Sequence, residues 1–197
     1  MKRTEGKGYK KMKFTVTPWD MNQLMKFAKH YIASDTVRPS FSLIQCEVNN
    51  TRIKAYCMGR CRICEVRFPV EEFEGKAGIC FLPPLPKCFL LKDGNINVRI
   101  EKNEVTYQNE VFSKTFKVEQ AQGIFPVKET FPAREIWGTS SSKIHFQPKQ
   151  LLEALQPFAN RNEPIRIDFV EEEGFLITQI DGDCSYKVLA FAVEISK

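Results

Sequence analysis

The chain has 197 residues, of which 43% are hydrophobic and 12% aromatic, a composition typical of a globular protein of one or two domains. No apolar run approaches the roughly 18 residues of a membrane-spanning helix, and no apolar stretch of a secretory signal follows the basic N-terminus. We therefore expect a cytoplasmic protein without a membrane partner, whose seven cysteines are mostly small buried hydrophobes.

The positive charge is concentrated at the N-terminus. Residues 1–13 contain six Lys or Arg and one Glu, and this net charge of +5 equals the formal net charge of the whole chain. The rest of the chain is formally neutral. Residues 1–13 are either a solvated tail or a basic flexible arm that contacts nucleic-acid phosphates, with Lys10 and Lys11 among its contacts.

The first predicted unit is a strand, a helix and three strands. Residues 12–17 predict the strand, and Thr17, Pro18 and Asp20 are typical of a helix start, with the helix ending near Ala33. Its apolar stripe is formed by Met21, Leu24, Met25, Ala28 and Ile32, and its polar side by Asn22, Lys26, Lys29 and His30. The three strands are expected at 40–48, 51–58 and 61–70.

The same order of elements is predicted twice more, with a period of roughly 55–65 residues. Unit two has a strand at 78–82, a helix position that three prolines reduce to a stub at 87–91, and strands at 95–101, 104–109 and 111–119. Unit three has a strand at 143–146, a helix between Pro148 and Pro157, and strands at 164–171, 174–180 and 185–193. Residues 123–142, rich in Pro, Ser and Thr, are interpreted as a connector.

The segment 57–64, CMGRCRIC, has the C-x3-C-x2-C spacing with which radical S-adenosylmethionine enzymes hold an iron–sulfur cluster. If 51–58 and 61–70 are strands, Cys61 and Cys64 point to opposite faces and cannot converge on one cluster. We therefore expect ordinary strand cysteines. A Cys-ligated iron–sulfur or zinc enzyme is the remote alternative, with Cys80 or Cys88 as a further ligand. No phosphate-binding glycine loop and no hydrolase motif occurs, so we expect no enzyme and no cofactor.

Several segments together resemble the bacterial sliding clamp, the DNA polymerase III beta subunit. They are MKFTV at 12–16 with the helix after it, RPSFSL at 38–43, EVFSKTF at 110–116 with Phe125-Pro126, and the strand–helix–three-strand order of 143–193. The resemblance implies an α+β sliding-clamp-like fold of about one and a half clamp domains. Together with the charge and composition of the chain, it predicts a basic flexible arm at 1–13, a clamp-like domain at 14–122, the connector at 123–142 and a clamp-like half-domain at 143–197.

The chain also departs from the clamp pattern. The signature Thr-Asp-Gly/Leu after the third strand is replaced by Cys57-Met58-Gly59. The C-terminal Met-Pro-Met-Arg-Leu of the family, which forms the floor of its partner pocket, is matched by 189–193, LAFAV, without the Pro and Arg.

The resemblance implies a non-catalytic protein that binds double-stranded DNA through phosphates, as a processivity-type accessory protein, for example of a phage or mobile element. Its implied DNA-binding residues are Lys26, Lys29, His30 and Arg38, together with the arm residues Lys10 and Lys11. The implied partner pocket is formed by Tyr186, Leu189 and Phe191. Implied partners are a polymerase or other replication proteins, together with self-association. The alternative is a clamp-fold interaction module or mimic that binds replication or defence proteins without encircling DNA.

Overall fold

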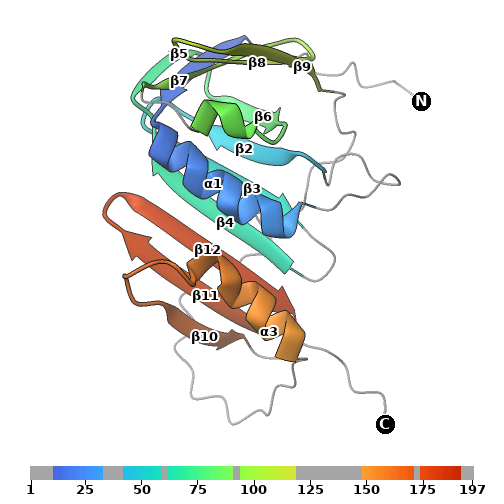
Figure 1. Ribbon diagram of the computed structural model, residues 1–197, viewed down its shortest axis with the longest axis vertical. Helices are drawn as coiled ribbons and strands as arrows, with labels where there is room; N and C mark the ends of the chain where they lie inside the picture. The colour runs from blue at the N-terminus through green and yellow to red at the C-terminus, as the bar shows by residue number, and fades with distance from the viewer. Residues whose placement is uncertain are drawn as a thin grey trace, which may run out of the picture.

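The computed structural model describes residues 11–32, 42–58, 62–90, 94–118, 148–170 and 174–191, and its elements follow the order of the three predicted units (Figure 1). Unit one consists of β1 (Met12–Val16), α1 (Pro18–Tyr31), β2 (Ile44–Val48), β3 (Arg52–Met58) and β4 (Arg62–Pro69). An additional strand, β5 (Glu72–Gly75), follows it. Unit two consists of β6 (Gly78–Leu82), η2 (Lys87–Leu90), β7 (Ile96–Glu101), β8 (Glu104–Gln108) and β9 (Ser113–Lys117). Unit three consists of α3 (Pro148–Leu155), η3 (Gln156–Phe158), β10 (Arg166–Val170), β11 (Gly174–Asp181) and β12 (Cys184–Phe191).

In the described part of the chain, the strands form two sheets in which neighbours run antiparallel. The five-stranded sheet has the order β5-β1-β7-β8-β9, and the seven-stranded sheet has the order β10-β11-β12-β4-β3-β2-β6. Units one and two exchange their first strands. β1 of unit one pairs with β7, and β6 of unit two pairs with β2. Because of this exchange, the two units share their sheets and one hydrophobic core.

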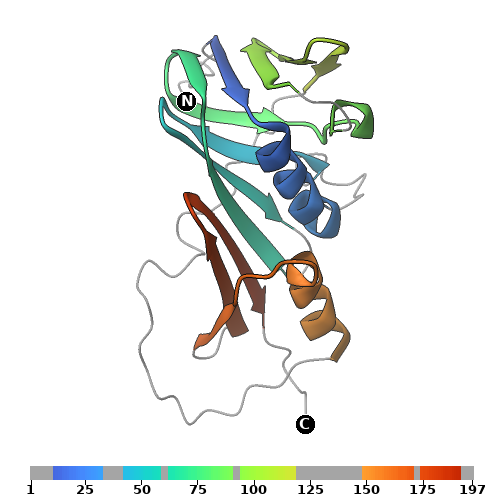
Figure 2. The same cartoon turned by 60° about the vertical axis from the view of Figure 1, so that its left-hand side comes forward.

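Unit three joins the molecule through its last strand. β12 pairs with β4 from Ser185 opposite Arg67 to Ala190 opposite Arg62, so the sheet of unit one continues into unit three. Figures 1 and 2 show α1 and α3 on the same face of this sheet, with η2 beside α1. We call α1, η2, α3 and η3 the helix layer.

The sequence explains how α1 is held against the sheet. Thr17 is the N-cap, and its Oγ1 accepts a hydrogen bond from the Asp20 N–H at 3.1 Å and donates one to Asp20 Oδ2 at 2.7 Å. The helix ends at Tyr31, two residues before the predicted end. The predicted apolar stripe lacked Phe27 and Tyr31, which are both buried, and Phe27 stacks on Tyr186 of β12 with ring centroids 5.1 Å apart.

One prediction needs correction at the N-terminal end of the fold, and one strand there was missed. The predicted arm 1–13 overlaps β1, because Met12 is buried in the core and Lys13 pairs with Glu74 across β5. Strand β5 was not predicted. Its glutamates face solvent, and it ends at Gly75, where a Cβ would lie 2.5 Å from the Lys11 carbonyl oxygen.

Most other predictions of elements are confirmed within a few residues. The shortened helix of unit two is the single 3-10 turn η2, as the prolines predict. The connector 123–142 and the strand 143–146 lie outside the described residues, so the domain boundaries stay a prediction. None of the helices in the described ranges is both long and apolar enough to cross a membrane.

Candidate nucleic-acid interface

The exposed side of α1 carries positive charge. Lys26 and Lys29 are exposed, and His30 is half-buried, so these three predicted residues lie on one helix surface. The ammonium group of Lys26 lies 5.8 Å from the ring centroid of Trp19, which is 59% exposed. The single acid of α1, Asp20, is buried. We call Trp19, Lys26, Lys29 and His30 the α1 surface. It presents two lysines without an exposed carboxylate from the same helix.

The exposed side of α3 is different, because its charges cancel. Lys149 is exposed and Glu153, one turn later, is half-buried. Within the helix layer, exposed lysines without an exposed acid on the same element therefore lie on α1 and at Lys87 of the neighbouring η2. Between α1 and the loop that joins η3 to β10 lies a cleft of about 300 Å³ that combines Lys26 and His30 with the amide side chains of Asn160 and Asn162, and two acids, Glu163 and Asp181, also line it. Amide and ammonium donors are typical of contacts to phosphate and sugar, but the two carboxylates make this cleft a poorer site for a phosphate than the exposed side of α1.

Arg161, in the loop after η3, ties unit three to α1, and its side chain is only 8% exposed. One terminal nitrogen of its guanidinium group donates to Gln23 Oε1 of α1 at 2.9 Å, and the other donates to Asp181 Oδ2 of β11 at 3.0 Å. The group lies 3.9 Å from the ring centroid of Tyr186. Burial raises the pKa of Tyr186 to about 12, against the opposing effect of the Arg161 charge.

Further contacts tie unit three to α1. The ring of Phe27 meets Phe158 edge-on, with centroids 5.2 Å apart, and the Tyr31 hydroxyl donates to the Ala154 carbonyl at 3.4 Å. The Cys184 thiol donates to Asp20 Oδ1 at 3.4 Å. Burial first, and the Asp20 carboxylate second, raise the pKa of Cys184 to about 11. These contacts place α1 and α3 side by side in one layer.

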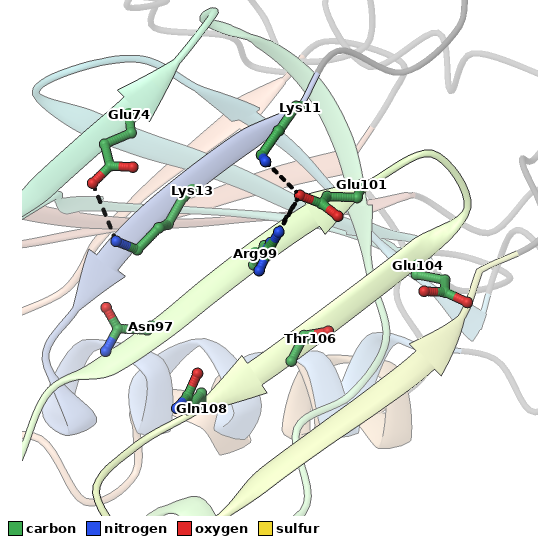
Figure 3. Close-up of a pocket in the computed structure, with 9 residues that line it drawn as sticks. All are labelled: Lys11, Lys13, Glu74, Asn97, Arg99, Glu101, Glu104, Thr106 and Gln108. Atoms are coloured by element: carbon green, nitrogen blue, oxygen red, sulfur yellow. Dashed lines mark hydrogen bonds and ion pairs between the residues drawn. The ribbon is translucent and has the colours of Figure 1, made fainter.

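A hollow on the other side of the molecule also contains basic residues. Figure 3 shows it on the face of the five-stranded sheet that points away from the helices. Lys11 and Arg99 both bind Glu101, with Lys11 Nζ 2.8 Å from Glu101 Oε1, and these contacts lower the pKa of Glu101. Three basic residues face three acidic ones in this hollow, so its charge is balanced and it does not suit a phosphate.

The structure separates the residues predicted to bind DNA. Lys26, Lys29 and His30 share the α1 surface, whereas Lys11 lies on the opposite side and binds Glu101. Lys10 and Arg38 are outside the described residues. Trp19 and Arg161 were not predicted, although the position of Trp19 at the start of α1 could have placed it on the polar side of the helix.

The predicted partner pocket falls on buried positions. Tyr186 is 1% exposed and Leu189 is 0% exposed, so in this conformation neither side chain can contact a partner peptide. Phe191 ends β12, and its side chain is outside the described part of the chain.

The cysteine motif lies in a hairpin, as the strand interpretation requires. Cys57 of β3 is directly opposite Cys64 of β4, and both thiols are buried on the face that packs against the core. Burial raises the pKa of Cys64, and its contact with Cys57 adds to the increase. Cys61 is outside the described residues. Within the described ranges, no group of three His, Cys, Asp or Glu side chains is arranged to hold a metal ion.

Comparison with solved structures identifies the fold. The chain superimposes on the DNA polymerase sliding clamp of Pseudomonas aeruginosa with a TM-score of 0.68 at 12% sequence identity, covering 94% of this chain and 66% of the clamp. The chain has the sliding-clamp fold. The Thermotoga maritima DNA polymerase III beta subunit gives a TM-score of 0.63 at 12% identity, and the Bartonella birtlesii clamp gives 0.65 at 11%. The coverages for both are again 94% of this chain and 66% of theirs.

The extent of the match agrees with one and a half clamp domains. The chain spans just under two thirds of the length of these clamps. No protein-family model and no curated protein sequence matches it. At identities of 9–12% the similarity shows the fold and leaves the function to be inferred from the surface of this chain.

Proposed function

We propose that this protein is a non-catalytic DNA-binding accessory protein of the sliding-clamp type. The observation that carries the proposal is the α1 surface, where Lys26 and Lys29 are exposed on the helix layer without an exposed acid on the same helix. In a clamp, the helix layer is the side expected to face the DNA. Two lysines one turn apart, on long flexible side chains, suit phosphates and do not impose a base sequence.

The proposal assigns no catalytic residue and no cofactor. Its partners are double-stranded DNA and a polymerase or another replication protein, because the solved structures with the same fold are named as polymerase clamps. A replication role in a phage or mobile element is part of the same proposal.

A clamp-fold interaction module is the second candidate function. The observation that favours it is the cancelled charge of α3, since a helix layer that only lines DNA has no need for an acid such as Glu153 at its surface. This candidate predicts a stable protein partner and no DNA affinity that depends on the α1 surface.

The proposal is tested by the salt dependence of DNA binding. Affinity for a labelled duplex of random sequence is measured by fluorescence anisotropy over a range of salt concentrations. Replacing Lys26 and Lys29 by Gln removes two phosphate contacts, so the slope of log affinity against log salt falls by about 1.8. A matched control replaces Lys76 and Lys117, two exposed lysines beside β5 and in β9, and leaves the slope unchanged. Equal slopes for all three proteins would reject α1 as the DNA-binding surface.

A further inference from the structure

Units one and two cover each other's outer surface, whereas the corresponding surface of unit three is not covered by any of the residues that the structure describes. In the complete domain, β6 of unit two covers the outer edge of β2, and η2 packs beside α1. The corresponding second strand of unit three is β10, which is the edge of the seven-stranded sheet among the described strands. In α3 only Ala154 is buried, while Leu151 and Leu152 are 37% and 68% exposed.

This surface forms an apolar groove of about 800 Å³ between α3, η3 and the segment that leads into β10. Its apolar lining consists of Leu152, Leu155, Phe158, Ala159, Pro164 and Ile165. Lys149 and Glu153 lie at its rim, four residues apart on α3. Ile167 of β10 is 41% exposed nearby along the chain, so apolar surface continues from the groove onto the edge strand.

We propose that a second copy of this chain docks on this groove, so that two third units complete one clamp domain about a twofold axis. The chain itself shows that two strand–helix–three-strand units pair to form a domain, with their helices in one layer. A second copy supplies a unit of this kind, and a twofold axis brings the same patch of both chains together.

The charges of α3 fit this occupant. When two copies of α3 lie antiparallel, Lys149 of one copy comes within reach of Glu153 of the other, and the same pair forms again across the axis. Leu152 lies between them and is removed from water. A patch with one lysine and one glutamate in this order is complementary to a second copy of itself. A partner of different sequence would not need the patch to be self-complementary.

The proposal rests on the fold and on this groove, and it does not depend on DNA binding. In the resulting dimer, the shared domain lies between the two complete domains, and both copies of α3 lie in one helix layer. The dimer therefore joins the two α1 surfaces without using either of them in the interface.

Sedimentation equilibrium of the 197-residue chain at micromolar concentrations tests the dimer. We expect the wild type to have the mass of two chains, and Leu152→Glu to raise the dissociation constant at least about tenfold by placing a carboxylate in the apolar interface. Leu152 is 68% exposed in one chain, so its substitution should leave the fold intact, as circular dichroism will show. The control Val111→Glu, at an apolar residue 59% exposed in the β8–β9 connection, should dimerise like the wild type. A monomeric wild type, or an equal loss in both variants, would overturn the proposal.

Charge reversal tests the geometry independently. Lys149→Glu alone and Glu153→Lys alone each place like charges across the axis and should weaken the dimer, whereas the double reversal restores opposite charges and should recover the wild-type dissociation constant to within about threefold. A double variant as weak as the single ones would refute the twofold packing of α3. The salt slope for DNA is then measured on Leu152→Glu. If that slope still depends on Lys26 and Lys29 in the monomeric variant, DNA binding by the α1 surface is independent of the dimer. A wild type that dimerises but shows no such slope would reject DNA binding by α1 and keep the dimer.

Discussion

Arg161 provides the sharpest test of how unit three is held against α1. The Arg161→Ala variant loses a hydrogen bond to Gln23, a charge-assisted hydrogen bond to Asp181 and the contact with the Tyr186 ring. Hydrogen bonds to charged groups contribute about 1.5–3 kcal/mol, neutral ones about 1 kcal/mol, and a desolvated cation–π contact about 1–2 kcal/mol. Asp181 is 36% exposed and regains water in the variant, which lowers the total. We therefore expect a loss of about 3 kcal/mol in the free energy of unfolding.

Urea denaturation followed by circular dichroism measures this loss. The matched control is Arg166→Ala, because Arg166 also pairs with an aspartate on the same sheet, with Nε 2.8 Å from Asp168 Oδ1, but its side chain is 42% exposed. An exposed ion pair contributes no more than about 1 kcal/mol, so the control should unfold near the wild-type urea midpoint. Equal losses for the two variants would refute the role of Arg161 in joining unit three to α1.

Three further predictions concern the arm, the cysteine motif and pH. Deletion of residues 1–10, which keeps β1 intact and removes four Lys or Arg and one Glu, should reduce the salt slope of DNA binding by up to about 3; an unchanged slope would show that the arm does not touch DNA. Cys61→Ser should leave folding and the visible absorption spectrum unchanged, and a visible band lost in the variant would contradict the strand interpretation of CMGRCRIC. The pKa of Cys184 is raised to about 11 in the folded state, so above about pH 9 the unfolded thiol loses its proton first and stability falls up to pH 11. Urea midpoints should fall less steeply with pH over this range in Cys184→Ala than in the wild type. Midpoints that fall equally in the two proteins would refute the raised pKa of Cys184.

The elements of this fold could be predicted from the sequence because their signals are local. Thr17 and Pro18 mark the start of α1, and the prolines before η2 leave no room for a full helix. The missed strand β5 has the alternation Glu-Phe-Glu, which is compatible with a strand. Its glutamates alone indicate a solvated turn, and only the pairing with β1 shows that the segment is a strand. The strand propensity of these residues does not indicate this long-range pairing of β5 with β1.

The candidate site could be predicted only in part, for the same reason. The polar side of α1 follows from its helical period, so Lys26, Lys29 and His30 were predicted to lie together. The position of Lys11 on the opposite side depends on which face of β1 meets the core, and its partner Glu101 is distant in sequence. The interaction of Arg161 with Gln23 and Tyr186 exists only because β12 pairs with β4, which brings together segments that no local pattern connects.

Lysine footprinting tests the central claim most directly, namely that the α1 surface faces DNA. Exposed lysines of the full-length protein are acetylated with and without duplex DNA, and the modification of each lysine is compared by mass spectrometry. We expect DNA to protect Lys26 and Lys29 in α1, while Lys76 and Lys117, on the side of the five-stranded sheet, react equally in both samples. Protection of Lys76 and Lys117 with full reactivity of Lys26 and Lys29 would show that the α1 surface does not face DNA.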